Sequence, residues 1–228
     1  MTGTVFSEVR LGDLLSAEPF TGIRQDAEGA DLISYVTTGL VAAIDVIDQR
    51  PTDQTRRVPK GRWASFGDIL LQCRGIERRT RVPAAIVRLD EELAFAESLI
   101  LVRVDPAIAH PDYLRLYLSS EVAGAALAAA ATGTTISYLR PEALAGVRLR
   151  LPALEAQIEI ASKLAGMQAN LRAIETTAAT FRDLIAAATE GLLTGSLRIR
   201  ALDHGTHRAR GRGPRTTDAP HQNAEGRS

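Results

Sequence analysis

The sequence contains one cysteine, Cys73, and four histidines, three of which lie in the polar segment after residue 200. A single thiol excludes an internal disulfide and a zinc site built from cysteines. The scattered histidines offer no metal cluster either, so we expect neither a metal nor a cofactor. Cys73 directly follows a strand-like apolar run, and we interpret it as a packed thiol rather than a nucleophile.

Long apolar runs are also missing. No run approaches the roughly 18 apolar residues that a membrane-spanning helix requires. The first residues, MTGTVFSEVRLGDLL, lack the basic start and apolar stretch of a signal peptide. Hydrophobic residues make up 45% of the chain and charged residues 24%, which is the balance of a soluble globular protein. We therefore expect a cytoplasmic protein.

The sequence lacks the motifs of the enzyme classes that act on nucleotides or nucleic acids. It has no phosphate-binding loop of the Gly-x-x-x-x-Gly-Lys type, no Asn-Pro-Pro-aromatic tetrapeptide of an amino-methyltransferase and no glycine-rich cofactor loop after a strand. An Asp followed by Glu-x-Lys, typical of nucleases, is also missing. The carboxylates at Asp90, Glu91 and Glu92 fit a solvated turn. We predict that the chain is not an enzyme.

Positive charge is abundant but unevenly placed. The formal net charge is zero, and yet eight basic residues against two acidic ones occur between Arg56 and Arg81. All but two of the 27 cationic residues are arginine, whose planar fork suits phosphate and guanine. This distribution predicts contact with nucleic acid. The alternative is a set of solvated surface arginines.

The basic residues fall into two loops on either side of a predicted strand, Asp68 to Gln72. If that strand is central, the loops lie at its opposite ends and do not form one patch. The second loop is our preferred reader of bases, while the remaining positive charge would contact phosphate, which positions without specifying. Hydroxyls beside Gly133 could contact DNA or simply bond the turn. The candidate DNA-contacting residues are Arg56, Arg57, Lys60, Arg62, Arg74, Arg78, Arg79, Arg81, Thr134, Thr135, Ser137 and Tyr138.

Residues 1–152 alternate short apolar runs with turn residues and predict a mixed α/β domain. Segments at 41–47, 68–72, 84–89 and 98–104 have the length and composition of strands. Segments at 110–120 and 122–131 predict helices, the first with Pro111 at its opening. The predicted fold class is α+β.

Residues 153–199 differ in composition from the preceding domain. Glycine and proline are nearly absent, and apolar residues recur with heptad spacing. Four heptads without a slip indicate a coiled-coil helix roughly 50 Å long, which needs another helix as its partner. The alternative is a long amphipathic helix lying on its own domain. The predicted seam consists of Ile160, Leu164, Met167, Leu171, Ile174, Ala178, Phe181, Ile185, Ala188 and Leu192. Residues 200–228 are polar and rich in Gly, Pro and Arg, and they predict a disordered tail.

Several short elements in a fixed order resemble the specificity subunits of type I restriction-modification systems. In that family a target-recognition domain ends in a strand with a Leu-Pro pair, and a Glu-x-Gln element, an Ile-Ala pair, a long helix and a Leu-Thr-Gly sequence follow. The matching residues here are Leu151 and Pro152, Glu155 and Gln157, Ile160 and Ala161, and Leu193, Thr194 and Gly195. A Gly-Asp-Ile-Leu strand at 67–75 and a Gly-Thr turn with a final strand at 132–152 resemble the family as well.

The resemblance implies a non-catalytic DNA-recognition subunit for phage defence, which delivers a methyltransferase and, in a restriction complex, an ATP-driven translocating nuclease to a bipartite site. Family members carry two recognition domains and two long helices, whereas this chain has one of each and resembles half a subunit. Two copies, or this chain and another half-subunit, would pair their helices. The alternative function is an assembly, regulatory or decoy protein that docks a partner through its coiled coil without reading DNA.

Overall fold

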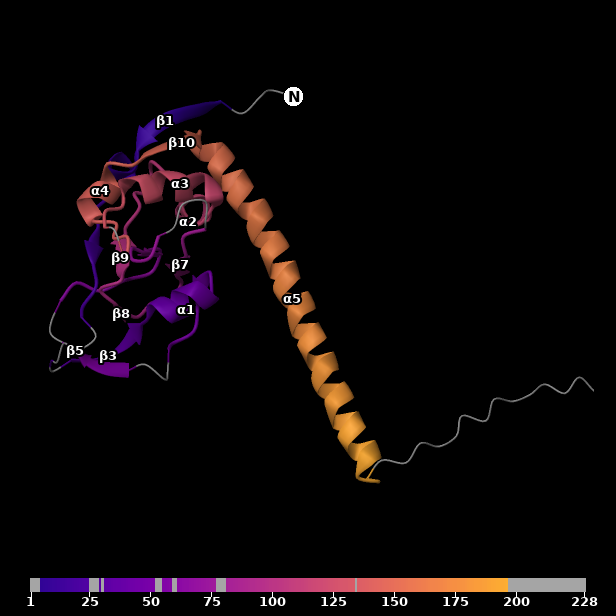
Figure 1. Cartoon of the computed structure of the whole chain (residues 1–228). Coiled ribbons are helices and arrows are strands. Elements are labelled where there is room, and N and C mark those ends of the chain that lie inside the picture. Colours follow the sequence, from indigo (N-terminus) through magenta and orange to yellow (C-terminus); the bar gives the residue numbers. More distant parts are fainter. Residues whose placement is uncertain are drawn as a thin grey trace, which may run out of the picture. The chain divides into compact units, whose positions relative to one another are not determined.

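The computed structural model describes residues 5–24, 29, 31–51, 55–58, 61–76, 81–133 and 135–196. It divides the chain into two compact units, Met1–Ala173 and Ile174–Ser228. The elements of the first unit have mixed α and β character, and a long helix, α5 (Leu154–Leu193), contributes residues to both units (Figure 1). The predicted α+β class and the long helix are confirmed. The tail predicted for residues 200–228 lies outside the described residues.

A five-stranded sheet forms the centre of the first unit. Its strand order is β2-β9-β6-β7-β4, with β4 parallel to β7 and the other neighbours antiparallel. The strands are β2 (Phe20–Thr21), β4 (Val46–Ile47), β6 (Ile69–Gln72), β7 (Ala84–Val87) and β9 (Leu99–Val102). Three of the predicted strands are therefore confirmed, and β6 is the central strand, which is the condition under which the two basic loops follow its opposite ends.

Both faces of this sheet are covered, which explains why its strands read as continuous apolar runs instead of alternating ones. Because side chains alternate along a strand, Ile69 and Leu71 enter one core cluster while Leu70 enters another. The first cluster packs against helices α2 (Pro111–Leu118) and α3 (Glu121–Ala130). The second packs against α1 (Thr38–Ala43). Both helices predicted near residues 110–131 are thus confirmed.

The strand predicted at 41–47 is wrong over most of its length. The structure forms α1 and only the two-residue strand β4 there. Thr37 is the reason: its Oγ1 accepts a hydrogen bond from the Leu40 backbone N–H at 3.3 Å and caps the helix. A favourable N-cap outweighs the weak strand preference of the valine and isoleucine residues that follow.

Two smaller sheets complete the first unit. A three-stranded sheet has the order β5-β3-β8 and consists of β3 (Asp31–Val36), β5 (Thr55–Val58) and β8 (Ala94–Phe95). The strand β1 (Phe6–Arg10) pairs antiparallel with β10 (Arg148–Pro152), the predicted final strand, which leads into α5 (Figure 1). A 3-10 helix (Leu11–Leu14) follows β1, and a short helix α4 (Pro141–Ala145) precedes β10.

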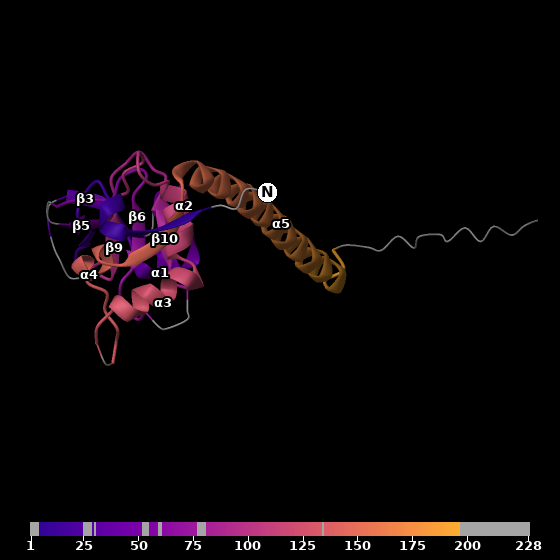
Figure 2. The ribbon, with the colours of Figure 1, turned by 90° about the horizontal axis from the view of Figure 1, so that it is seen from above.

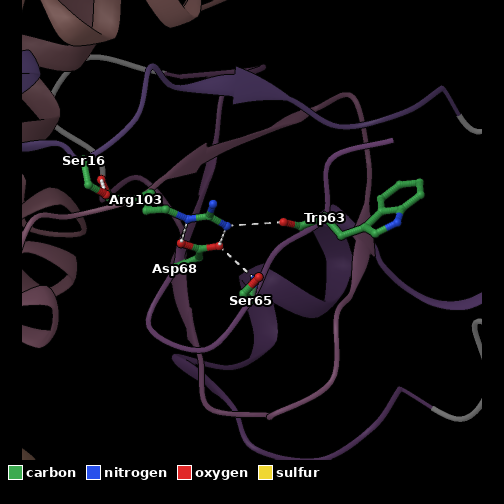
Figure 3. Close-up of polar contacts among 5 residues, drawn as sticks. All are labelled: Ser16, Trp63, Ser65, Asp68 and Arg103. Atoms are coloured by element: carbon green, nitrogen blue, oxygen red, sulfur yellow. Dashed lines mark hydrogen bonds and ion pairs between the residues drawn. The ribbon is translucent and has the colours of Figure 1, made fainter. Parts of the chain in front are cut away.

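The Gly-Asp pair before β6 builds an ion pair at the edge of the core. Arg103 donates from Nε and Nη2 to the two carboxylate oxygens of Asp68 at 2.8 and 2.6 Å, and Nη2 also reaches the Trp63 carbonyl at 3.5 Å (Figure 3). Asp68 accepts a further bond from the Ser65 N–H at 2.8 Å, and Gly67 supplies a positive φ of 88° within the same turn. The hydrogen bonds to Asp68 raise the pKa of Arg103. This motif is therefore structural, and it fixes the turn from which β6 starts.

Candidate DNA interface

Two segments that are far apart in the sequence meet beside the C-terminal end of β6. Gly75 donates its N–H to the Ser137 carbonyl at 2.9 Å, Ser137 Oγ donates to the Ile76 carbonyl at 2.6 Å, and Leu139 donates its N–H to the Cys73 carbonyl at 2.8 Å. The Gly-Thr turn therefore lies against the segment that carries the second basic loop. The sequence pattern alone predicts these two segments as separate candidates, and the fold brings them together.

The Gly-Thr turn is a narrow hairpin closed by backbone hydrogen bonds in both directions between Thr132 and Tyr138, at 2.9 and 2.7 Å. Gly133 has a φ of 115°, and an added Cβ would lie 2.5 Å from the Ile136 carbonyl oxygen, so only glycine fits. In Figure 2 this segment, between α3 and α4, extends away from the rest of the first unit. Thr135 and Ile136 are exposed on it. The hairpin thus presents a hydroxyl and an isoleucine to an approaching molecule.

Arg74 lies at the junction of these two segments. Its guanidinium carbon is 5.6 Å from the centre of the Tyr138 ring, and its Nη2 is 3.4 Å from a carboxylate oxygen of Glu97. Burial raises the pKa of the Tyr138 phenol, so the ring is uncharged at neutral pH. About half of the Arg74 side chain is exposed. The ring and the carboxylate restrict the orientation of the Arg74 guanidinium, and its remaining N–H donors can still reach a ligand.

A hollow of about 390 Å³ adjoins Arg74 and Glu97. The other residues that line it come from the end of β3, the start of α1 and the turn before β9, and they are rich in hydroxyl groups. They are Tyr35, Thr37, Thr38, Gly39, Ala96 and Ser98. The Thr38 and Ser98 hydroxyls are hydrogen-bonded to each other. Hydroxyls both donate and accept, so with Arg74 and Glu97 the hollow combines cationic, anionic and neutral polar groups of the kind that read base edges.

The first basic loop contacts a different part of the domain. The guanidinium carbon of Arg62 lies 4.0 Å from the centre of the Phe20 ring. This contact borders a second hollow of about 520 Å³, which is also lined by Glu18, Trp63 and Glu142. The Arg62 and Arg74 contacts therefore engage different rings on different elements.

The other predicted DNA-contacting residues have varied outcomes. Arg57 is exposed on β5, Arg81 is exposed before β7, and only the backbone of Arg56 is described. Lys60, Arg78, Arg79 and Thr134 lie outside the described residues. Our preferred base readers thus stay predictions. Arg74, Ser137 and Tyr138 are brought together by the fold, and Thr135 lies on the same hairpin.

Sequence reasoning missed Glu97, Thr37, Thr38 and Ser98. Glu97 follows a buried strand and gave no motif. Thr37 and Thr38 were included in no element, although a threonine pair before a glycine is a common helix start and could have indicated an N-cap. Their common location depends on the pairing of β3 with β8 and of β6 with β9, which local sequence does not encode.

Cys73 precedes Arg74 and is fully buried, as predicted for a packed thiol. Burial raises the pKa of this thiol from 9.0 to about 11. The unfolded chain releases this proton at a lower pH than the folded chain, so stability should fall as the pH rises from about 9 to about 11. Urea unfolding at pH 8 and at the top of this window should show the loss, and Cys73→Ala should show less of it. Identical pH dependence in both proteins would contradict this expectation.

Within the described ranges, no group of three or more His, Cys, Asp or Glu side chains is arranged to hold a metal ion. No helix in the described part of the chain combines the length and the hydrophobicity needed to cross a membrane.

The seam predicted on α5 is largely exposed in the single chain. Met167, Ile174 and Phe181 are 66%, 65% and 60% exposed, and Ile185 is 64% exposed. Ile160 instead packs against the core of its own domain. The unpartnered apolar stripe therefore begins after Ile160, at Leu164.

No protein-family model matches the chain. No curated protein matches it either. Solved structures do match. A chain from a structure of complex assembly and conformational transition of a type I R-M system has a TM-score of 0.59 and 18% identity, over 85% of this chain and 46% of that one.

Two further matches are restriction-modification subunits. The type I S subunit from M. genitalium has a TM-score of 0.56 and 15% identity, over 85% of this chain and 47% of that chain. The HsdS subunit from Thermoanaerobacter tengcongensis has a TM-score of 0.53 and 19% identity, over 87% of this chain and 51% of that chain. The chain spans about half the length of the proteins it matches. Its fold is therefore that of a type I restriction-modification specificity subunit, over about half of such a subunit.

Proposed function

We propose that this chain is a non-catalytic DNA-recognition subunit of a type I restriction-modification complex. In this role it directs a methyltransferase, and in a restriction complex also a translocating nuclease, to a bipartite DNA site. The observation that carries the proposal is the assembly of Arg74, Tyr138 and a hydroxyl-lined hollow on a domain with the specificity-subunit fold. The exposed apolar seam residues of α5 would let this helix pair with the same helix of a second copy, so that the two recognition domains read two half-sites.

Arg74 is the residue that we expect to read a base. Two of its donors can bond guanine O6 and N7, the commonest specific contact in the major groove. Its ion pair with Glu97 is half-exposed and therefore weak, so DNA can replace the carboxylate at low cost. The ring of Tyr138 would then hold the plane of the guanidinium while its partner changes. The exposed arginines on β5 and before β7 would contact phosphate and orient the domain without specifying sequence.

The proposal is tested by co-expressing the chain with the methyltransferase encoded nearest to it and sequencing the host methylome by single-molecule reads. A new, split and palindromic methylated motif is expected, because two identical copies would read two identical half-sites. A split but asymmetric motif would identify a heteromeric pairing with another recognition domain. A complex that assembles without any new motif would contradict DNA recognition and support the assembly or decoy function.

Arg74→Ala should weaken binding to a duplex that contains the motif identified in the methylome by about 10- to 100-fold. One good bidentate base contact is worth about 1–3 kcal/mol. Discrimination at the base pair it reads should relax as well. Fluorescence anisotropy with the motif and with a scrambled duplex, over a range of salt concentrations, measures both effects. Arg148→Ala removes a more exposed arginine from β10, where it pairs with Glu8 at 2.9 Å, and serves as the control for the loss of a surface arginine. Equal losses of affinity on both duplexes for Arg74→Ala would identify a phosphate contact instead of a base reader.

A further inference from the structure

The first turns of α5 are attached to the recognition domain through Gln157. Its Oε1 accepts a hydrogen bond from the His110 N–H at 3.0 Å, and its Nε2 donates to the Pro152 carbonyl at 2.9 Å. Gln157 is only 3% exposed, and Ala161, one turn later, is 2% exposed. The attachment connects α5 to the start of α2 and to the end of β10. It fixes the point at which the helix leaves the domain.

A second attachment lies farther along α5, at Gln168. The Gln168 amide donates from Nε2 to Asp45 Oδ2 at 3.1 Å and accepts at Oε1 from Arg115 Nη2 at 3.4 Å. Arg115 Nη1 is 3.6 Å from the same Asp45 oxygen. Arg115 belongs to α2, and Asp45 lies between α1 and β4. Helix α2 and the turn between α1 and β4 therefore both contact one glutamine of α5.

This second attachment is a poor source of stability. The Arg115 side chain is 5% exposed, whereas that of Asp45 is 49% exposed and shares its charge with water. Burial lowers the pKa of Arg115. The Asp45 carboxylate opposes this effect, whereas the positive charges of Arg172 and Arg88 lower the pKa further. Arg115 Nε is buried, and no acceptor among the described residues reaches it. A hydrophobic side chain of similar size in such a place is often neutral or stabilising. The contribution of Arg115 is instead to orient α5 on the domain.

The spacing of the two glutamines along α5 shows how the two attachments orient the helix. Gln157 and Gln168 are eleven residues apart, which is about three turns, so both side chains lie on one face of the helix about 16 Å apart along its axis. A single attachment would leave the helix free to pivot and roll. Two attachments on one face fix its tilt and its rotation. Met167, next to Gln168 and about 100° around the helix, is turned into the exposed seam.

We propose that Arg115 is a positioning residue which, with Asp45 and Gln168, fixes the rotation and tilt of α5 on the recognition domain and so sets the distance between the two DNA half-sites. The inference rests on the proposed function, in which paired helices hold two recognition domains apart. B-DNA rises by about 3.4 Å per base pair, so a shift of that size at the recognition surface changes the spacer by one base pair. A loosely held helix would accept several spacers, and a fixed one accepts a single spacer.

Arg115→Met tests this role, because it removes the bonds and the charge and keeps an apolar stem. Arg148→Met is the matched control, since it changes the same residue type at the exposed ion pair with Glu8. Both variants are expected to melt within a few degrees of the wild type. If Arg115→Met does not fold, Gln168→Leu is used in its place, because it breaks the helix side of the network and leaves Arg115 beside Asp45.

The first measurement needs no DNA. Cysteines introduced at Ala125 on α3 and Ala169 on α5, both exposed, carry spin labels, while the buried thiol of Cys73 stays unlabelled. The labelled full chain is diluted with unlabelled chain, and the distances are measured by pulsed electron resonance. The wild type and Arg148→Met are expected to give one narrow distribution, and Arg115→Met a broad or divided one. A narrow, unshifted distribution in Arg115→Met overturns the proposal.

The second measurement is the methylome of cells that express the chain with its methyltransferase. Wild type and Arg148→Met should methylate one spacer length, and Arg115→Met should also methylate sites whose spacer differs by one base pair. A single unchanged spacer in Arg115→Met overturns the link to half-site spacing. Absence of any motif with the wild type contradicts the proposed function instead, and the spin-label distances still decide whether Arg115 positions the helix.

Discussion

Replacing Arg103 with methionine is expected to lower the free energy of unfolding by about 3–5 kcal/mol, the usual cost of leaving a buried charge without its partner. Asp68 is 1% exposed, so its carboxylate would lose both bonds from the guanidinium and could not be hydrated. Of the three hydrogen bonds to the Asp68 carboxylate, only the one from the Ser65 N–H would remain, and one bond does not compensate for a buried negative charge. The turn that starts the central strand β6 depends on this carboxylate (Figure 3).

The reciprocal change should cost much less. The Arg103 side chain is 40% exposed and can be hydrated when its partner is lost, and an asparagine at position 68 still accepts the Ser65 bond. We expect Asp68→Asn to cost about 1–2 kcal/mol, and Arg103→Met with Asp68→Asn to be more stable than Arg103→Met alone. Urea unfolding followed by the fluorescence of Trp63, the only tryptophan, measures all three variants. Equal costs for the two single variants would contradict the asymmetry.

Placing charge in the seam of α5 is expected to abolish self-association of the chain. Ile174→Asp together with Phe181→Asp puts two carboxylates into each helix, at positions that are 65% and 60% exposed in the single chain. In a paired helix these positions are apolar knobs that fill holes on the partner, and an unpaired carboxylate there must be desolvated. We expect the dimer dissociation constant to rise by more than about 100-fold, which corresponds to about 2.8 kcal/mol.

Analytical ultracentrifugation of the purified chain measures this effect. Ala179→Asp with Ala186→Asp adds the same charge to α5 at positions about 120° to 160° around the helix from Ile174 and Phe181, and it controls for helix propensity and net charge. The control should remain a dimer. If wild type and seam variant are both monomers at high concentration, the partner helix belongs to a different chain. Dissociation of both variants alike would count against the seam.

The sequence determined the elements whose signals are local. The runs at β6, β7 and β9 are short and apolar because both faces of the sheet are covered, and Pro111 marks the start of α2. The Ser120 cap of α3, whose Oγ accepts from the Ala123 N–H at 3.3 Å, became evident only in the structure. The heptads after residue 153 predicted the long helix, and the ordered motifs predicted the specificity-subunit fold. The segment at 41–47 was misassigned, because one capping hydroxyl outweighed strand propensity.

Only the tertiary structure decided which side chains meet. Arg74, Glu97 and Tyr138 come from three separated stretches, and Asp45, Arg115 and Gln168 from three others. Such meetings depend on sheet order and on which helix covers which face, and these follow from the burial of the whole core rather than from any local pattern. The sequence by itself therefore determined the kinds of elements and their order, because hydrophobic period and capping act over a few residues. The direction of the candidate base reader and the attachment of the long helix arise from contacts between residues up to 123 positions apart, which packing alone selects.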